Sequence, residues 1–268
     1  FSKLELAYVA SLIPGLIPEG MLSVLAGEQG LGKSLLHANW AAQLSREGKA
    51  TVIVSAEDSP THTTKARLIA AQADTEIIHH ARSRPIFGNH DDDLWLVRVH
   101  AWIVSTGARL IVLDPLAALL DNQTDSYKDQ HVRRVLGALD ALARNTGCAI
   151  LYIMHLTKAA GSNPLQRISG SSAFTAAARS VLLLAPETTP DEAGRIVAHV
   201  KCNVAEKAAP QRWEMMRILV PNPPRPDIET ARLEYCSKAD VDVYSLLAPR
   251  EEAEDKSSRE QAVEIIEM

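Results

Sequence analysis

Residues 27–34, with the sequence GEQGLGKS, combine the residue types and spacing that bind the phosphates of a nucleotide. Glycines let backbone N–H groups converge on an anion without obstruction by Cβ atoms. The lysine can reach the outer phosphates, and the serine hydroxyl can bind Mg²⁺. The pattern Gly-x-x-x-x-Gly-Lys-Ser therefore predicts a loop that binds ATP and Mg²⁺ through Gly27, Glu28, Gln29, Gly30, Leu31, Gly32, Lys33, Ser34 and Leu35.

Carboxylates follow two apolar segments that read as buried strands. Asp114 ends the segment RLIVLDP and is expected to help orient Mg²⁺. Glu57 and Asp58 follow the segment ATVIVS on a different strand. We assign Glu57 as the group that polarises the attacking water. Asp58 is the alternative base, although its place beside Ser59 favours an acid at the start of a helix.

The elements around these residues alternate between strands and helices. The phosphate-binding loop has an apolar strand at 21–27 before it and a helix at 33–47 after it, and the partial positive charge at the helix start favours an anion. A chance glycine-rich turn would not need this context. A dinucleotide-binding loop is excluded because Leu35 stands where that motif requires its third glycine.

Further strands and helices are predicted from apolar spacing. Strands are expected at 50–55, 109–115, 148–155 and 180–186, with later strands near 195–202 and 212–219. Helices are expected from Ser59 onward, at 91–106 with Leu94, Val97, Ala101 and Val104 on one stripe, and at 129–146 with Val132, Val135, Leu136, Leu139 and Leu142 at helical spacing. This order predicts an α/β fold with a mainly parallel twisted sheet, helices on both faces and a C-terminal antiparallel extension.

The amino-acid composition limits the classes of protein to which this chain can belong. The chain has 268 residues, of which 46% are hydrophobic and only 4% aromatic, so aliphatic α/β packing is favoured. The net charge of −5 excludes a generally basic surface, and nucleic-acid binding would need a local basic strip. Three widely spaced cysteines indicate reduced thiols and a cytoplasmic location. No apolar stretch is long enough to predict a membrane span.

The ordered set of motifs resembles the RecA-like P-loop ATPases. The motifs are GEQGLGKS, VSAED, LIVLDPLAALL, MHLTK and SGSSAFTAAARSVLLL. They are most similar to those of the plasmid RepA-type hexameric replicative helicases and of related AAA family ATPases from phages and mobile elements, with DnaB-type helicases as broader relatives. The resemblance extends over most of the chain, and the ordered set is more specific than the phosphate-binding motif alone.

The resemblance implies roles at matching positions. Lys33 and Ser34 correspond to the Walker A pair, Glu57 to the catalytic glutamate and Asp114 to the Walker B aspartate. His155 corresponds to a sensor of the γ-phosphate, although by itself it would be read as an ordinary core histidine. Arg179 corresponds to an arginine finger that enters the site of a neighbouring subunit.

The segment between His155 and Gly170 corresponds to a loop that faces the central channel and contacts single-stranded DNA in this family. It carries Lys158 and Arg167 and no acidic residue. Repeated around a ring, such cations would favour salt-sensitive binding of a DNA backbone. A solvated loop is the alternative. DnaB-type relatives have a lysine and an arginine two positions apart on a late strand, but this chain has Lys201 and Asn203.

The resulting expectation is a homo-oligomeric, hexameric ring that hydrolyses ATP to move single-stranded DNA, with a replication-initiation protein as a partner. A filament-forming recombination or repair ATPase and a non-motor ATP-dependent switch are the alternatives. Residues 1–236 are expected to form the ATPase domain. Residues 237–268 are expected to form a charged linker and a short helix.

Overall fold

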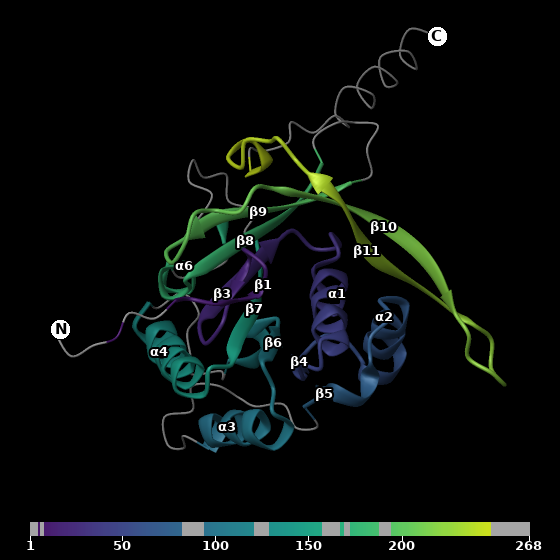
Figure 1. Ribbon diagram of the computed structural model, residues 1–268, viewed down its shortest axis with the longest axis horizontal. Helices are drawn as coiled ribbons and strands as arrows, with labels where there is room; N and C mark the ends of the chain where they lie inside the picture. The colour runs from purple at the N-terminus through teal and green to yellow at the C-terminus, as the bar shows by residue number, and fades with distance from the viewer. Residues whose placement is uncertain are drawn as a thin grey trace, which may run out of the picture.

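A nine-stranded sheet forms the centre of the described part of the computed structural model (Figure 1). The structure describes residues 5, 8–81, 94–120, 129–156, 167–168, 172–187 and 194–247. The strands are β3 (Leu22–Gly27), β4 (Thr51–Ser55), β5 (Ile78–His80), β6 (Leu110–Asp114), β7 (Ala149–His155), β8 (Ser180–Pro186), β9 (Arg195–Cys202), β10 (Gln211–Val220) and β11 (Ile228–Lys238). A small hairpin of β1 (Ser11–Ile13) and β2 (Ile17–Pro18) precedes the sheet.

The strands follow the order β11-β10-β9-β8-β3-β7-β6-β4-β5 across the sheet. From β8 to β5 every neighbouring pair is parallel, whereas β9, β10 and β11 pair antiparallel. The predicted fold class is therefore confirmed. The carboxyl ends of β3, β4, β6 and β7 meet at one edge, which is where sites form in sheets of this kind.

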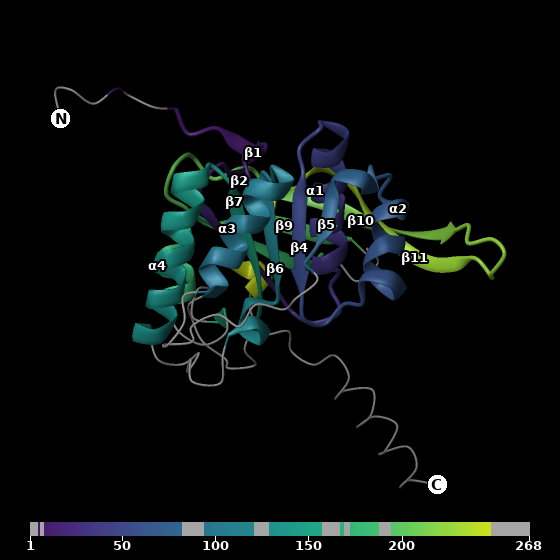
Figure 2. The ribbon, with the colours of Figure 1, turned by 90° about the horizontal axis from the view of Figure 1, so that it is seen from below.

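Helices cover both faces of the sheet (Figure 2). They are α1 (Lys33–Arg46), α2 (Lys65–Ala70), α3 (Leu94–Thr106), α4 (Asp129–Thr146) and the short α6 (Ala173–Ala177), with helical turns η1 (Pro60–Thr64), η2 (Thr75–Ile77), η3 (Leu116–Leu119) and η4 (Ser245–Leu247). Alternate residues of β3 point to opposite layers. Leu25 packs in one core with Trp40 of α1, and Val24 packs in the other with Leu136 of α4.

The apolar spacing predicts the buried side of the helix correctly for α4 but not for α3. In α4 all five spaced residues are buried, as their spacing indicates. In α3 the stripe of Leu94, Val97, Ala101 and Val104 is exposed instead, and Trp95, Val99 and Ile103 contact the core. Because α3 is apolar on nearly all sides, it offers two stripes, and the one with the bulky Trp95 faces inward.

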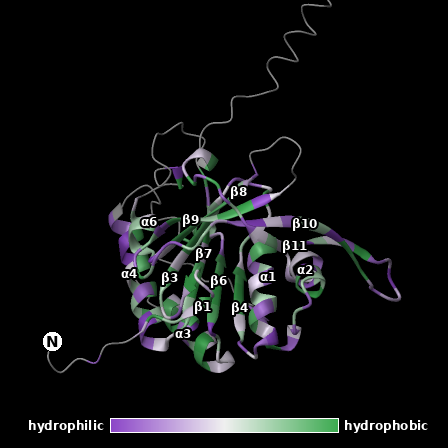
Figure 3. Ribbon diagram, turned by 45° about the horizontal axis from the view of Figure 1, so that its top comes forward, coloured by the Kyte–Doolittle hydropathy of each residue, from purple (hydrophilic) through white to green (hydrophobic). Residues whose placement is uncertain are grey.

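Strand β11 is a difference from the sequence-based expectation. It pairs with β10 along its whole length, from Val220 opposite Ile228 to Gln211 opposite Lys238. Only Leu233 of β11 is buried, so the segment lacks the apolar alternation that indicates a strand. The proline-rich connector at 220–227 is the turn of this hairpin, which passes over α1 and α2 and extends beyond them (Figures 1 and 3).

Packing continues beyond residue 236, where the ATPase domain was expected to end. Val243 and Leu246 pack against the core that contains Val24 and Leu136. The short helix expected near the C-terminus lies outside the described residues. Among the helices that are described, none combines the length and the apolar character needed to cross a bilayer.

Candidate functional site

The phosphate-binding loop joins the end of β3 to the start of α1, as its motif predicts. Two glycines are needed for geometric reasons. Gly32 precedes the helix with φ of 94°, a left-handed conformation that side chains rarely adopt. A Cβ atom on Gly27 would lie 2.5 Å from the carbonyl oxygen of Leu184 on β8. The loop can therefore pass close to β8 and direct its backbone toward the mouth of the helix.

Lys33 is buried at the base of this loop. Its Nζ donates hydrogen bonds to the carbonyl oxygens of Gly27 at 2.9 Å and Glu28 at 2.7 Å. Burial lowers the pKa of Lys33, although the nearby carboxylates of Asp114 and Glu57 oppose this shift. The lysine is thus held within its own loop by contacts that a phosphate group could replace.

Asp114 and Ser34 meet at the carboxyl end of β6, as expected. Ser34 Oγ donates to Asp114 Oδ2 at 3.0 Å, and His37 Nε2 donates to the same oxygen at 3.0 Å. Burial alone would raise the pKa of Asp114, but the hydrogen bond and charge of His37, the Ser34 hydroxyl and the Lys33 charge together hold it below its ordinary value. Asp114 is therefore a carboxylate at neutral pH.

His37 was not anticipated from the sequence. It lies three positions after Ser34 on α1, and residues three apart share a helix face. This spacing is the signal that could have identified it. The side chain is 3% exposed, and no partner for its Nδ1 is present among the described residues.

Glu57 and His155 approach each other at the same edge of the sheet. His155 Nε2 lies 3.8 Å from Glu57 Oε1. Burial and the Lys33 charge lower the pKa of His155, while Glu57 and Asp114 partly offset them. His155 is therefore neutral at physiological pH, and its ring has no hydrogen-bond partner among the described residues. His155 is one of the residues that line the cleft.

Asp58 differs from its expected role at the start of the helix. Its carboxylate pairs with the guanidinium of Arg67, which had not been singled out. Ser59 is the residue that caps the turn η1, because its Oγ accepts a hydrogen bond from the backbone N–H of His62 at 3.3 Å. The Asp58 carboxylate is therefore held in an ion pair with Arg67. The Glu57 side chain, by contrast, is 59% exposed and faces the cleft.

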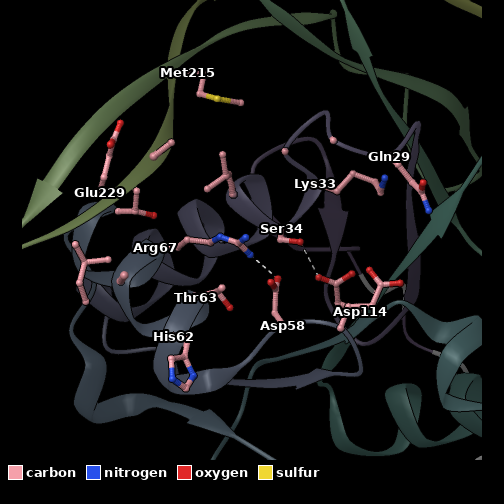
Figure 4. A pocket seen from close by; sticks show the side chains of 18 of the residues that line it. Gln29, Lys33, Ser34, Asp58, His62, Thr63, Arg67, Asp114, Met215 and Glu229 are labelled. Carbon is pink, nitrogen blue, oxygen red and sulfur yellow. Dashed lines mark hydrogen bonds and ion pairs between the residues drawn. The ribbon is translucent and has the colours of Figure 1, made fainter.

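These residues line one cleft of about 850 Å³. Its walls include the phosphate-binding loop, the ends of β4, β6 and β7, and the start of α2. Figure 4 shows Lys33 and Gln29 at one end, with Ser34 and Asp114 joined beside the Asp58–Arg67 pair. The opposite wall comes from the β10–β11 hairpin, including Met215 and residues 228–231. The sequence predicted β10 but neither β11 nor the packing of the hairpin over the cleft, so this wall was not anticipated.

Arg179 lies far from the cleft of its own chain. Its backbone N–H donates to the carbonyl of Leu22 at 2.9 Å, so it sits at the amino end of β3 and β8. The phosphate-binding loop begins at the other end of β3, about 16 Å away at roughly 3.3 Å per residue. The Arg179 side chain is exposed.

Lys201 lies near Arg179, and its ammonium group is hydrogen-bonded to backbone carbonyl oxygens. Its Nζ donates to the carbonyl oxygens of Thr175, Ala176 and Ala178 at 2.8, 3.2 and 3.0 Å. These carbonyls belong to the end of α6, so the ammonium stabilises that helix terminus. Contact with a phosphate would require Lys201 to give up these hydrogen bonds.

The predicted DNA-binding residues are only partly described. Lys158 lies outside the described residues. Arg167 is 13% exposed at its side chain, and its Nη2 lies 3.5 Å from Glu28 Oε1 in the phosphate-binding loop. Arg195 of β9 donates from Nε to the carbonyl of Leu31 at 3.2 Å. Two arginines remote in the sequence therefore contact the loop, and neither contact was predicted.

The donor set at Ser34 and Asp114 fits Mg²⁺. A hydroxyl and an ionised carboxylate are hard oxygen ligands, and Mg²⁺ is commonly bound by one or two protein oxygens, with waters and substrate phosphates completing its shell. Within the described ranges no group of three or more His, Cys, Asp and Glu side chains could form a separate metal site.

Comparison with models of protein families matches residues 1–161 to a family described as AAA domain. The matched span is more than half of the 268 residues. It includes the phosphate-binding loop, Glu57, Asp114 and His155, and it ends before Arg179 and the β10–β11 hairpin. No curated protein matches the chain.

Proposed function

This chain belongs to the AAA domain family and is an ATPase of the P-loop kind, and on that premise we propose that it is a ring-forming motor that translocates on single-stranded DNA. The specific activity proposed is that of a replicative DNA helicase similar to the RepA-type and DnaB-type proteins. ATP with Mg²⁺ is the proposed fuel.

The observation that carries the proposal is the separation of Arg179 from its own cleft. The two lie at opposite ends of the parallel pair β3 and β8. An arginine that cannot reach the phosphates of its own chain can reach those of a neighbour when copies assemble head to tail. Head-to-tail contacts use two different faces of each subunit and close into rings when the rotation permits. Arg179 is therefore assigned as the finger that completes the adjacent site.

Within each cleft the side chains have distinct tasks. Lys33 exchanges its loop carbonyls for phosphate oxygens, and Ser34 with Asp114 binds the metal. When bound, Mg²⁺ offsets the negative charge of the phosphates. Glu57 orients the attacking water and accepts its proton. Neutral His155 contacts the terminal phosphate from the end of β7.

Coupling to DNA is proposed to pass from His155 into the residues that follow it. His155 ends β7, and Lys158 follows three positions later. A shift of His155 on phosphate release would move the segment that carries Lys158. Arg167, at the far end of this segment, contacts Glu28 of the phosphate-binding loop. Both ends of the proposed DNA-binding segment thus adjoin the nucleotide cleft.

Strand displacement on a forked duplex tests this function, with the mass of the assembly measured in the same buffer. The proposal predicts ATP-dependent unwinding by a ring of uniform size and ATPase stimulated by single-stranded DNA. A filament without unwinding would favour the recombination or repair alternative. Turnover that is weak and indifferent to DNA would favour a nucleotide switch. Either result would contradict the motor.

A further inference from the structure

The cleft is larger than a phosphate site requires and has two parts. The phosphate part contains Lys33, Ser34, Glu57, Asp114 and His155. The remaining wall, which we name the hairpin lobe, includes the apolar residues Ala66 of α2, Met215 of β10, and Ile228 and Ala231 of β11, and the polar residues Arg217, Glu229 and Thr230 beside them. In Figure 4, Met215 lies above Ser34, and Glu229 of the hairpin lies across the cleft from Lys33.

The hairpin lobe is in direct contact with the phosphate-binding loop. A Cβ atom placed on Gly32 would lie 3.6 Å from Met215 Cε and 3.8 Å from Leu233 Cδ1. The loop glycine therefore packs beneath the hairpin side chains. A substrate that extends from the start of α1 would pass these side chains directly.

Two contacts fix the hairpin over the helices. Asn39 of α1 donates a hydrogen bond from Nδ2 to the carbonyl of Leu233. Arg232 donates from Nη1 to the carbonyl of Ala70 at the end of α2, at 3.1 Å. Because β10 and β11 also pair along their whole length, the lobe is a preformed wall of the cleft. Preformed apolar walls with a few polar groups are typical of small-molecule sites.

We propose that the hairpin lobe binds the nucleobase of the nucleotide, with Met215 as its principal contact. A thioether packs favourably against an aromatic ring, and methyl groups such as those of Ala66 and Ala231 exclude water from its faces. The inference rests on nucleotide binding in this cleft, which is part of the proposed function. It adds that one chain supplies the base site by itself, without a neighbouring copy.

Met216 provides a matched control for Met215. The two residues are adjacent on β10. Met215 is 37% exposed and Met216 is 40% exposed, so their truncation removes similar accessible side-chain area. Successive side chains of a strand point to opposite faces. Met215 lines the cleft, whereas Met216 is not among the residues that do. A change that acts only through the general stability of the hairpin should affect both variants.

The test is calorimetric titration of the wild type, Met215→Ala and Met216→Ala with two probes in the presence of Mg²⁺. The probes are a non-hydrolysable ATP analogue and inorganic tripolyphosphate, which lacks base and ribose. We expect Met215→Ala to weaken binding of the analogue by about tenfold, as loss of a sulfur–aromatic contact would. Tripolyphosphate affinity should stay within about twofold of the wild type. Met216→Ala should match the wild type with both probes.

Two results would overturn the inference. One is unchanged affinity of Met215→Ala for the analogue. The other is an equal loss for both probes, which would indicate a distorted phosphate-binding loop. Thermal unfolding of each variant identifies a folding defect. Because no DNA is present, failure of this test leaves the motor proposal standing, and absence of DNA stimulation leaves the base site standing.

Discussion

The imidazole of His155 lies 3.8 Å from the carboxylate of Glu57, although their strands, β7 and β4, are separated in the sheet by β6. The pair spans the edge of the sheet beside Lys33 and Asp114. Both residues line the same cleft. The proposed coupling of hydrolysis to the segment after β7 depends on this proximity of the two strand ends.

Glu57→Gln should retain nucleotide binding and lose turnover. The amide keeps the size of the side chain but cannot accept the proton of water, and loss of a general base typically costs about 10² to 10⁴ in rate. Steady-state ATPase measured beside analogue binding checks this. Glu76→Gln, on an exposed turn, is the matched control and should behave as the wild type. Normal hydrolysis by Glu57→Gln would move the role of base to another group.

His37→Leu should lower the affinity for Mg²⁺ more than the affinity for nucleotide. His37 orients Asp114 through its Nε2 hydrogen bond, and loss of such an outer partner costs about 10- to 100-fold in metal affinity. The Mg²⁺ concentration for half-maximal ATPase should therefore rise, and saturating Mg²⁺ should restore part of the rate. His37→Gln, whose amide can donate, should be intermediate.

The control for His37 is His100→Gln on the exposed side of α3. It should leave the Mg²⁺ dependence unchanged. If His37→Leu lowers the rate equally at every Mg²⁺ concentration, His37 does not act through the metal. Loss of α1 packing would then be the explanation, and thermal unfolding would reveal it.

Protein stability should fall as the pH drops through the range set by His199. This buried side chain accepts a hydrogen bond at Nδ1 from the backbone N–H of Ala208, so its Nε2 carries the proton and donates to Ser180 Oγ at 2.9 Å. Burial lowers the pKa of His199 from 6.5 to about 4. The unfolded chain therefore binds a proton that the folded protein excludes between these two values. Stability is retained above pH 6.5 and declines toward pH 4.

Chemical unfolding between pH 7.5 and pH 4.5 checks this effect against His199→Gln. The histidine should contribute a pH-dependent loss of at most about 3 kcal/mol, which the variant lacks. The difference in unfolding free energy between the two proteins should therefore shrink as the pH falls. A difference that is constant over the whole range would show that His199 does not titrate in this way.

Much of the fold was predictable because its central elements carry strong local patterns. Apolar runs such as 110–114 form the parallel strands, and the spacing of α4 anticipates its buried side. Strand β11 was not predictable in this way. Its strand conformation depends on pairing with β10, and its side chains are mostly exposed. The exposed stripe of α3 shows that apolar spacing alone does not select the buried side of a nearly all-apolar helix.

The candidate site likewise contains residues that the sequence predicts and contacts that it does not. Lys33, Ser34 and Asp114 were predictable because a local motif and a strand end determine their positions. The contacts of Arg167 and Arg195 with the phosphate-binding loop depend on tertiary packing, as does the wall formed by Met215. Such contacts bring together residues more than a hundred positions apart. No local pattern in the chain signals them.

The most direct test of the central claim is ATPase measured after mixing two inactive variants, Arg179→Ala and Glu57→Gln. The claim is that one chain supplies the cleft and the next supplies the finger. Each variant alone should lack turnover while remaining folded and able to assemble. In mixed rings roughly a quarter of the interfaces would join an intact cleft to an intact finger, so activity should reappear and rise with single-stranded DNA. A mixture that stays inactive, or Arg179→Ala that hydrolyses ATP at the wild-type rate by itself, would contradict the account.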